Sequence, residues 1–583
     1  MFLRNVLATI VGLVIFSIVV FFIFLGMITA ISATDDGVEI SDNTILHLKL
    51  DRPILERSAD SPLSDLQLLG APTGVGVKEL RQAVERAAVD DRISGIYLET
   101  QFMYAGLSKL KEFREALETF KESGKFLVAH SEYYTESEYY LASAADEIYL
   151  PEEGFLEFNG FRAEYNFLKG GLDKLGVQPQ VFRVGAYKSA VEPFTRTDMS
   201  PEAREQLESL LASVYEIYLD DISSTRNVDS PTLDLVADSM LATSAKNAAA
   251  HKLISGTLYH DEVMNLLKEK AEVEEDDDLK LVGLNAYLSS SKEIYQGKER
   301  IAVVFAEGEI INGKGDPESI GTDIMVKELT KLREDDKIKA IVLRINSPGG
   351  SSLASDVIWR ELKKTSETKP VIASMSDVAA SGGYYLAMAC DTIVAQPTTI
   401  TGSIGIYSMH FNAQELLEDK LGITTDVAKT GPLADIFTVS RPLTEYEKSL
   451  FQKSVDDGYE TFTSKAAEDR DMKLDDLKAI AQGRVWSGVQ AKENGLVDVL
   501  GGLQTAVEIA AAAAGVEEDN YKLRYYPAQK TLWEQLMSDF GADIEEAALK
   551  TKLGDLYPYV KQLRNLDRYQ GLQTRMPFDL SIH

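Results

Sequence analysis

The sequence predicts an α/β protein made of two copies of one fold, preceded by a single membrane-spanning helix. Three observations predict it. Short apolar runs alternate with helical patterns, the chain matches itself at a fixed shift, and its N-terminus carries a long uncharged stretch. At 583 residues the chain is long enough for several folding units.

The uncharged stretch covers residues 6–31 and is rich in Ile, Val, Leu and Phe. As a helix it would be roughly 39 Å long, enough to cross a bilayer with some tilt. Because the apolar part of a cleaved signal peptide usually has only about 7–15 residues, we expect an uncleaved signal-anchor over residues 1–34, while the small residues within Ala30–Ala33 also allow a cleavage site. Arg4 precedes the stretch and acidic residues follow it. The positive-inside rule therefore keeps the short end in the cytoplasm and exports the body.

The internal repeat is the firmest of the three observations. A shift of 245 residues aligns residues 76–160 with residues 321–405 without a gap, and 17 of these 85 positions are identical. Composition alone would give about one match in sixteen. The identities also cluster, as where Tyr139–Ala142 recurs as Tyr384–Ala387. The chain therefore contains one fold twice.

Strand and helix patterns alternate within the second copy. Apolar runs rich in β-branched residues predict buried strands at residues 301–305, 340–345, 371–374 and 393–395. Helical spacing lies between them, at residues 323–333, 353–364 and 383–390. This alternation is typical of βαβ units with right-handed crossovers in a mostly parallel sheet.

The same patterns give domain boundaries. We expect a first copy over residues 35–270, a linker over 271–298, a second copy over 299–515 and a C-terminal helical extension over 516–583. The linker contains the acidic cluster 274–278, which is typical of a solvated segment. Residues 543–573 have the spacing of one or two amphipathic helices.

Composition excludes several classes of function. The net charge of −32 argues against nucleic acid as a partner, because no basic footprint is present to displace counterions. The single cysteine, Cys390, excludes an internal disulfide framework and a cysteine-based zinc site. No His/Asp/Glu cluster has metal-ligand spacing, so neither a metal nor another cofactor is expected.

Two glycine-rich turns in the second copy could carry chemistry. The first is Asn346–Gly350, in which Gly349 and Gly350 leave backbone amides unobstructed close to a helix start, as an oxyanion hole requires. The second is Thr401–Gly405, in which the Ser403 hydroxyl stands on a tight turn. Taken alone, each pattern is also typical of an ordinary structural turn.

Comparison of the two copies strengthens both patterns. Ser403 falls on Phe158, and the Pro-Gly-Gly of the first turn falls on residues 103–105, so the fold itself does not require them. The six histidines show no pattern suited to a base for Ser403. Lys188 lies in one of the more apolar settings for a lysine, and its counterpart in the second copy is Ala434. Burial can make a lysine a base by lowering its pKa, yet pattern alone does not single out Lys188.

Longer strings resemble the motifs of the signal peptide peptidase A (protease IV) family in its long form. The lysine motif is matched by Phe182–Phe194, the oxyanion motif by Asn346–Ser351 and the nucleophile motif by Thr401–Gly405. A further family stretch is matched by Gly483–Gly488 with Gly495–Asp498. They occur in the family's order, and the resemblance extends from the N-terminal stretch to about Ala514.

The resemblance implies two tandem Clp-protease/crotonase-like domains that share one Ser–Lys dyad. Ser403 would be the nucleophile, Lys188 the general base, and Gly349 and Gly350 the oxyanion hole. Thr425 is a candidate for a hydroxyl that orients the lysine. The resemblance also implies a homotetramer on the bacterial inner membrane, anchored by its N-terminal helix with its body on the periplasmic side. There it would digest cleaved signal peptides and other unstructured apolar peptides.

Two other functions are compatible with parts of the pattern. A crotonase-type acyl-CoA enzyme would share the fold and the oxyanion hole, but it would need neither Ser403 nor Lys188. A non-catalytic membrane scaffold would account for the loss of the site from the first copy.

Overall fold

The computed structural model describes residues 4–5, 9–13, 15–19, 26, 40–58, 74–274, 277–294, 297–316, 318–517, 520–528 and 571–576. Among these residues no helix is long and apolar enough to span a membrane. Most of the expected anchor, residues 1–34, lies outside the described residues, as do the amphipathic helices expected over 543–573, except residues 571–573.

The first repeat is built on a six-stranded parallel sheet with the order β10-β7-β5-β4-β1-β11. Its strands are β1 (Thr44–Leu50), β4 (Ile93–Thr100), β5 (Phe126–His130), β7 (Glu147–Leu150), β10 (Gly256–Thr257) and β11 (Leu281–Gly283). Helices α2 (Val77–Val89), α3 (Leu107–Lys121) and α4 (Glu136–Ala142) connect the strands from β3 (Val75–Gly76) to β7. Apolar side chains of the strands and helices form one core.

The second repeat has the sheet order β21-β19-β17-β15-β12-β23, with β18 beside β17 and β22 beside β18. Its strands are β12 (Glu299–Glu307), β15 (Ile338–Ser347), β17 (Val371–Ala380), β18 (Thr392–Ala395), β19 (Ile400–Gly402), β21 (Val485–Ser487), β22 (Val499–Leu500) and β23 (Tyr521–Tyr526). Its helices include α12 (Thr322–Glu334), α13 (Ser352–Ser366), α14 (Gly382–Ala387) and α18 (Leu503–Ala513). The central strands are buried on both faces, which is why they read as unbroken apolar runs in the sequence.

The repeat predicted from the sequence is confirmed by the structure. The pairs α2 and α12, α3 and α13, and β7 and β18 coincide at the shift of 245 residues. Each repeat also closes with a strand placed beside its first strand, β11 next to β1 and β23 next to β12. Residues 281–283 therefore complete the first sheet and are not linker, and residues 521–526 are a strand of the second sheet and not helix.

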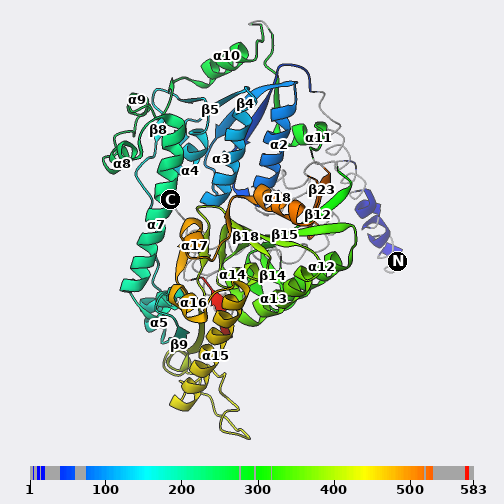
Figure 1. Ribbon diagram of the computed structural model, residues 1–583. Coiled ribbons are helices and arrows are strands. Elements are labelled where there is room, and N and C mark those ends of the chain that lie inside the picture. The colour runs from blue at the N-terminus through cyan, green and yellow to red at the C-terminus, as the bar shows by residue number, and fades with distance from the viewer. Residues whose placement is uncertain are drawn as a thin grey trace.

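A third sheet joins the two repeats in the order β14-β13-β16-β24-β20-β9. Strands β13 (Glu309–Ile311), β14 (Ser319–Gly321), β16 (Gly349–Ser351) and β20 (Ile406–Asn412) come from the second repeat. Strand β9 (Gln178–Val184) comes from the first repeat and pairs with β20 along its whole length, while β24 (Gly571–Arg575) comes from the end of the chain. In Figure 1 the first repeat, blue to cyan, stands above the green and orange second repeat, and α7 (Pro201–Arg226) runs along one side of both.

Buried charges also couple the repeats. The Arg344 guanidinium of β15 lies 2.8 Å from Glu56 and 2.9 Å from Glu112, both of the first repeat. Arg81 lies 2.8 Å from Glu112 on its other side. The Arg344 and Glu56 side chains are each 1% exposed, so removing one partner would leave an uncompensated charge in the interior. The two repeats are therefore fixed to each other rather than merely tethered.

Candidate active site

Ser403 stands on a sharp turn between β19 and β20. Its φ of +50° lies in the left-handed region, which costs a residue with a Cβ about 1 kcal/mol or more. Gly402 before it also has a positive φ, of +78°. The turn is held because the Ser403 amide donates to the Arg484 carbonyl at 2.7 Å. Backbone strain of this kind is typical of functional sites, which makes Ser403 a candidate functional residue.

Lys188 reaches Ser403 from the other repeat. Strand β9 pairs antiparallel with β20, with Val184 opposite Ile406, and the chain after β9 delivers Lys188 to the turn. Its Nζ lies 3.0 Å from Ser403 Oγ and 3.1 Å from the Ser403 carbonyl oxygen. The structure thus brings together the two residues selected from different copies.

Burial shifts the pKa of this lysine. Lys188 is fully buried, and its hydrogen-bond partners include two hydroxyls and a carbonyl oxygen. Desolvation disfavours the ammonium form and lowers the pKa of Lys188 well below its ordinary value. A neutral amine beside a serine hydroxyl can accept that hydroxyl's proton.

Ser381 supplies a second hydroxyl, which the sequence analysis missed. Its Oγ lies 2.9 Å from Lys188 Nζ, and its amide donates to the Gly402 carbonyl at 2.8 Å, which ties it to the nucleophile turn. Thr425, the hydroxyl expected to orient the lysine, lies instead in the exposed stretch 421–430, and the structure does not bring it to the buried amine. The repeat carried a signal for Ser381, since Glu136 stands at its position in the first copy.

The two candidate oxyanion glycines lie on β16, which β24 separates from β20 in the third sheet. Gly349 has a φ of +98°, and a Cβ there would lie 2.7 Å from the Gly382 amide nitrogen. Gly350 pairs with Ile310 of β13, and a Cβ there would lie 2.1 Å from the Ile310 carbonyl oxygen. Both positions therefore require glycine. Gly382 directly follows Ser381, so β16 lies on the side of the site where Ser381 contacts Lys188.

The loop of residues 482–484 forms a further wall of the site. Gly483 has a φ of +77°, and a Cβ there would lie 2.6 Å from Lys188 Cβ. Its amide donates to the Ile404 carbonyl at 2.8 Å, and the Gln482 carbonyl accepts from the Tyr187 amide at 3.1 Å. The loop thus holds the chain on both sides of the Lys188–Ser403 pair. The sequence analysis noted this stretch only as a family resemblance.

The corresponding place in the first repeat is filled. Phe158, at the position of Ser403, is 3% exposed and packs edge-on against Tyr139. Glu136, at the position of Ser381, accepts hydrogen bonds from the Asn159 and Gly160 amides. Burial raises the pKa of Glu136 to about 7. In the first repeat, the residues at the positions of Ser403 and Ser381 therefore serve packing and hydrogen bonding.

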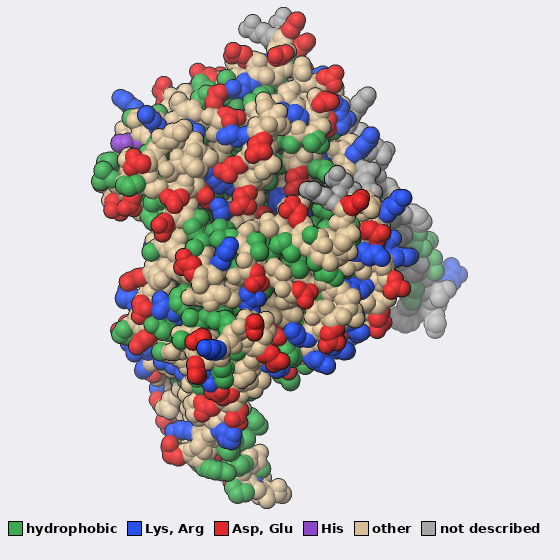
Figure 2. All heavy atoms as spheres, in the orientation of Figure 1, with side chains coloured by type: hydrophobic (Ala, Val, Ile, Leu, Met, Phe, Trp, Pro, Cys, Tyr) green, Lys and Arg blue, Asp and Glu red, His purple; other side chains and the backbone are tan. Residues whose placement is uncertain are grey.

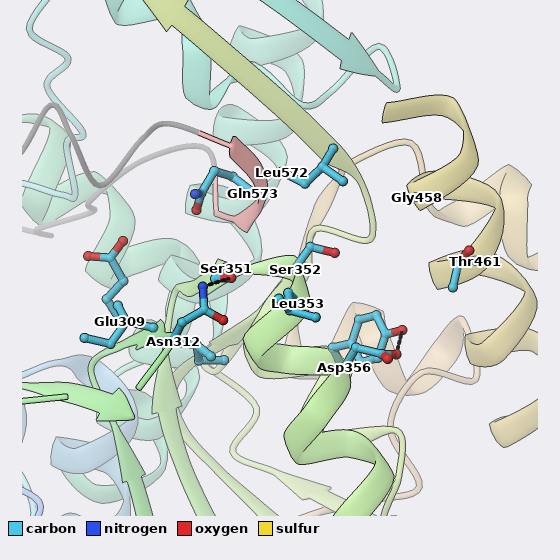
Figure 3. Close-up of a pocket in the computed structure, with 13 residues that line it drawn as sticks. Glu309, Asn312, Ser351, Ser352, Leu353, Asp356, Gly458, Thr461, Leu572 and Gln573 are labelled. Atoms are coloured by element: carbon cyan, nitrogen blue, oxygen red, sulfur yellow. Dashed lines mark hydrogen bonds between the residues drawn. The ribbon is translucent and has the colours of Figure 1, made fainter. Parts of the chain in front are cut away.

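A cavity of about 760 Å³ extends away from the oxyanion strand. Figure 3 shows it between β13, the start of α13, the C-terminal strand and α15 (Glu445–Asp469), with Leu572 and Gln573 on its border. Asn312 on its wall donates to Ser351 Oγ at 3.1 Å. The cavity meets β16 at its last residue, Ser351, so it offers space beside the end of this strand.

Comparisons with known proteins show the family of the chain. The model of peptidase family S49 matches residues 119–274 and 363–517, one segment in each repeat, and that of Clp protease matches residues 296–400. The chain is 36% identical to Protease 4 of Salmonella typhi over 80% of its own length and 76% of the relative's, and 32% identical to Protease 4 of Haemophilus influenzae over 91% and 90%. It is 38% identical to the chloroplastic serine protease SPPA of Arabidopsis thaliana over 76% of its own length, which spans 66% of that relative. The chain belongs to peptidase family S49 and is a serine peptidase of the protease 4 type.

Proposed function

We propose that this chain is a serine endopeptidase in which Ser403 is the nucleophile and Lys188 the general base. The observation that carries the proposal is the 3.0 Å hydrogen bond between Lys188 Nζ and Ser403 Oγ inside a site whose burial lowers the pKa of the amine well below its ordinary value. A Ser–Lys pair needs this arrangement, because a protonated lysine cannot accept the serine proton.

The geometry supports a two-step hydrolysis. Lys188 Nζ takes the proton from Ser403 Oγ, which attacks the peptide carbonyl, and the Gly350 and Gly349 amides stabilise the oxyanion. Lys188 then donates that proton to the leaving amine, which leaves an acyl ester on Ser403. Water, deprotonated by Lys188, hydrolyses the ester and restores the serine hydroxyl. The Ser381 hydroxyl hydrogen-bonds to Lys188 Nζ and so helps to hold the amine between Ser403 Oγ and the leaving nitrogen.

The proposed substrates are cleaved signal peptides and other unstructured apolar peptides. Support comes from the relatives, which include a protein named as a putative signal peptide peptidase SppA from Enterococcus faecium. Support also comes from the cavity beside β16, because an extended peptide can enter it whereas a folded domain cannot.

We further propose that the protein sits in the bacterial inner membrane through residues 6–31, with its body on the periplasmic side. The length of that uncharged stretch and the charges around it support this topology. A homotetramer is the proposed assembly. Its support is the exposed apolar segment before α15, which includes Leu421, Ile423, Val427 and Phe437, the last 78% exposed. Apolar side chains lie at the lower tip of the molecule in Figure 2.

The two alternative functions explain less of the site. A crotonase-type acyl-CoA enzyme does not need a buried lysine hydrogen-bonded to the Ser403 hydroxyl. The matched family also consists of peptidases. A non-catalytic scaffold would gain nothing from a desolvated amine, whose burial costs stability.

Substitution of the dyad tests the proposal. Ser403→Ala, Lys188→Ala and Lys188→Arg should each lower kcat roughly a thousandfold or more on a fluorogenic apolar peptide, the last because a guanidinium stays protonated. Ser224→Ala and Lys246→Arg, at exposed positions of the first repeat, are matched controls and should keep wild-type rates. Near-wild-type turnover by any of the three dyad variants would refute the assignment.

A further inference from the structure

The C-terminal strand β24 lies between the two strands that carry the catalytic turns. It pairs antiparallel with β16, which contains the oxyanion glycines, and antiparallel with β20, which follows Ser403. Gly349 faces Arg575, Gly350 faces Thr574 and Ser351 faces Gln573. The following Met576 amide donates to the Pro348 carbonyl at 2.6 Å. These main-chain contacts are those that an extended peptide of almost any sequence could make.

Three side chains of this segment are held by contacts with the residues around them. Arg575 forms an ion pair with Glu309 of β13 at 3.1 Å. Thr574 is fully buried, and its hydroxyl donates to the Gly350 carbonyl at 3.2 Å. Met576 is 4% exposed. Leu572 and Gln573 border the open cavity shown in Figure 3, so the strand is not enclosed at that end.

Met576 fills an apolar pocket that both repeats build. Its walls come from α7 of the first repeat and from β17, β19 and β21 of the second, through Leu207, Leu210, Val214, Ala380, Ile400 and Val485. Ala380 directly precedes Ser381, and Val485 pairs with Gly402 beside the nucleophile. The pocket thus includes the residue before Ser381 and the strand partner of the residue before Ser403.

The dyad is closed in this arrangement. Ser403 and Lys188 are both 0% exposed. A substrate must nevertheless contact Ser403 Oγ and approach the amides of Gly349 and Gly350, whose strand β24 already pairs with. A peptide that uses the β16 edge must therefore take the place of β24.

We propose that residues 571–576 are an intramolecular ligand of the substrate groove, which an extended peptide displaces before it is cleaved. This inference rests on the proposed peptidase function. The contacts of the segment also define the peptide that competes best: an extended chain with an unbranched apolar residue in the Met576 pocket, preceded by a basic residue that faces Glu309.

The size of the effect follows from the covalent attachment of the segment. A segment attached to the same chain has an effective concentration on the order of 1 mM. If the free segment binds with a Kd of about 0.1 mM, the groove is free about a tenth of the time, and the observed KM is raised roughly tenfold. Release of the segment should therefore lower KM roughly tenfold and leave kcat unchanged.

Met576→Asp provides the first test in the full chain, because a carboxylate is disfavoured in the apolar pocket. We expect a roughly tenfold lower KM on a fluorogenic peptide, with kcat unchanged. Val89→Asp adds the same charge at a 74% exposed apolar residue of the first repeat and should keep the wild-type KM. A Met576→Asp variant whose KM is not lower than that of the wild type overturns the inference.

Two binding measurements complete the test. A labelled Gly-Leu-Gln-Thr-Arg-Met peptide should bind Ser403→Ala/Met576→Asp at least tenfold more tightly than Ser403→Ala by fluorescence anisotropy, and equal affinities would overturn the inference. This measurement needs no catalysis, so an absence of hydrolysis with the affinity difference intact would refute the peptidase function alone. In the unmodified protein, saturating acetyl-Gln-Thr-Arg-Met-aldehyde should speed amide hydrogen exchange in residues 571–576. Unchanged exchange there would show that β24 is a permanent strand.

Discussion

Replacement of Lys188 by methionine should stabilise the protein at neutral pH while it abolishes activity. Burial lowers the pKa of Lys188 well below its ordinary value, and the proposed base role requires a neutral amine in the fold, whereas the lysine of the unfolded chain carries a proton at pH 7. Release of that proton from a group with an unfolded pKa of roughly 10.4 costs about 4.6 kcal/mol at pH 7. Methionine has a similar length and carries no such cost.

The lost hydrogen bonds offset part of this gain. Lys188 Nζ contacts Ser381 Oγ, Ser403 Oγ and the Ser403 carbonyl oxygen, at a net value of about 1 kcal/mol each. The variant should then be about 1–2 kcal/mol more stable than the wild type at pH 7. Because the unfolded wild-type chain holds a proton that the folded chain lacks, wild-type stability rises with pH up to the unfolded pKa. At pH 9.5 the cost of deprotonation is about 1.2 kcal/mol, so the wild type should then be the more stable by about 2 kcal/mol.

Equilibrium urea unfolding at pH 7 and pH 9.5 measures both differences. Lys246→Met, at an exposed position of α9 (Ala245–Ala250), is the matched control and should show no such reversal. A Lys188→Met variant whose stability relative to the wild type is the same at both pH values would show that Lys188 is charged in the fold. The general-base role would then be excluded.

Three further predictions concern the same site. The kcat/KM of the wild type should rise with pH through a value well below the ordinary pKa of lysine, because only the neutral amine is a base, and a rising limb near pH 10 would contradict this. Ser381→Ala should lower kcat about tenfold or more with KM little changed. It should also move the rising limb of the pH profile to lower pH, because a hydrogen bond that favours the ammonium form of Lys188 is lost. An unmoved limb would assign Ser381 a purely structural role. Gly483→Ala should lower kcat at least about tenfold, because the added Cβ pushes against Lys188 Cβ. The control Gly124→Ala, at a φ of +79° with no atom within 4 Å of the added Cβ, should lower stability alone. Equal kcat values for the two variants would contradict the contact argument.

Much of the site could be predicted because the repeat acts as an internal control. Residues that the fold needs recur at the shift of 245, so Ser403 and the glycines of β16 stood out by their absence from the first copy. Long central strands such as β12 and β15 were also predicted, since burial on both faces leaves unbroken apolar runs.

The features that the sequence did not reveal depend on tertiary pairing. Ser381 resembles any serine before two glycines until its amide meets the Gly402 carbonyl. Strand β11 has only three residues, too few to show a period of two, so it was assigned to a linker. The sequence of β24 is polar, and it forms a strand because it pairs with the edges of β16 and β20.

The pairing of β9 with β20 also bears on how the enzyme is made. The lysine arrives with the first half of the chain and the serine with the second, and they meet only when a strand of one half lies along a strand of the other. During synthesis the first half emerges alone, and it carries Phe158 where the nucleophile would be. With the proposed dyad, a nascent chain gains its peptidase site only after the later half has been translated and has folded against the first. The division of the proposed dyad over two halves thus delays proteolysis until both halves have met.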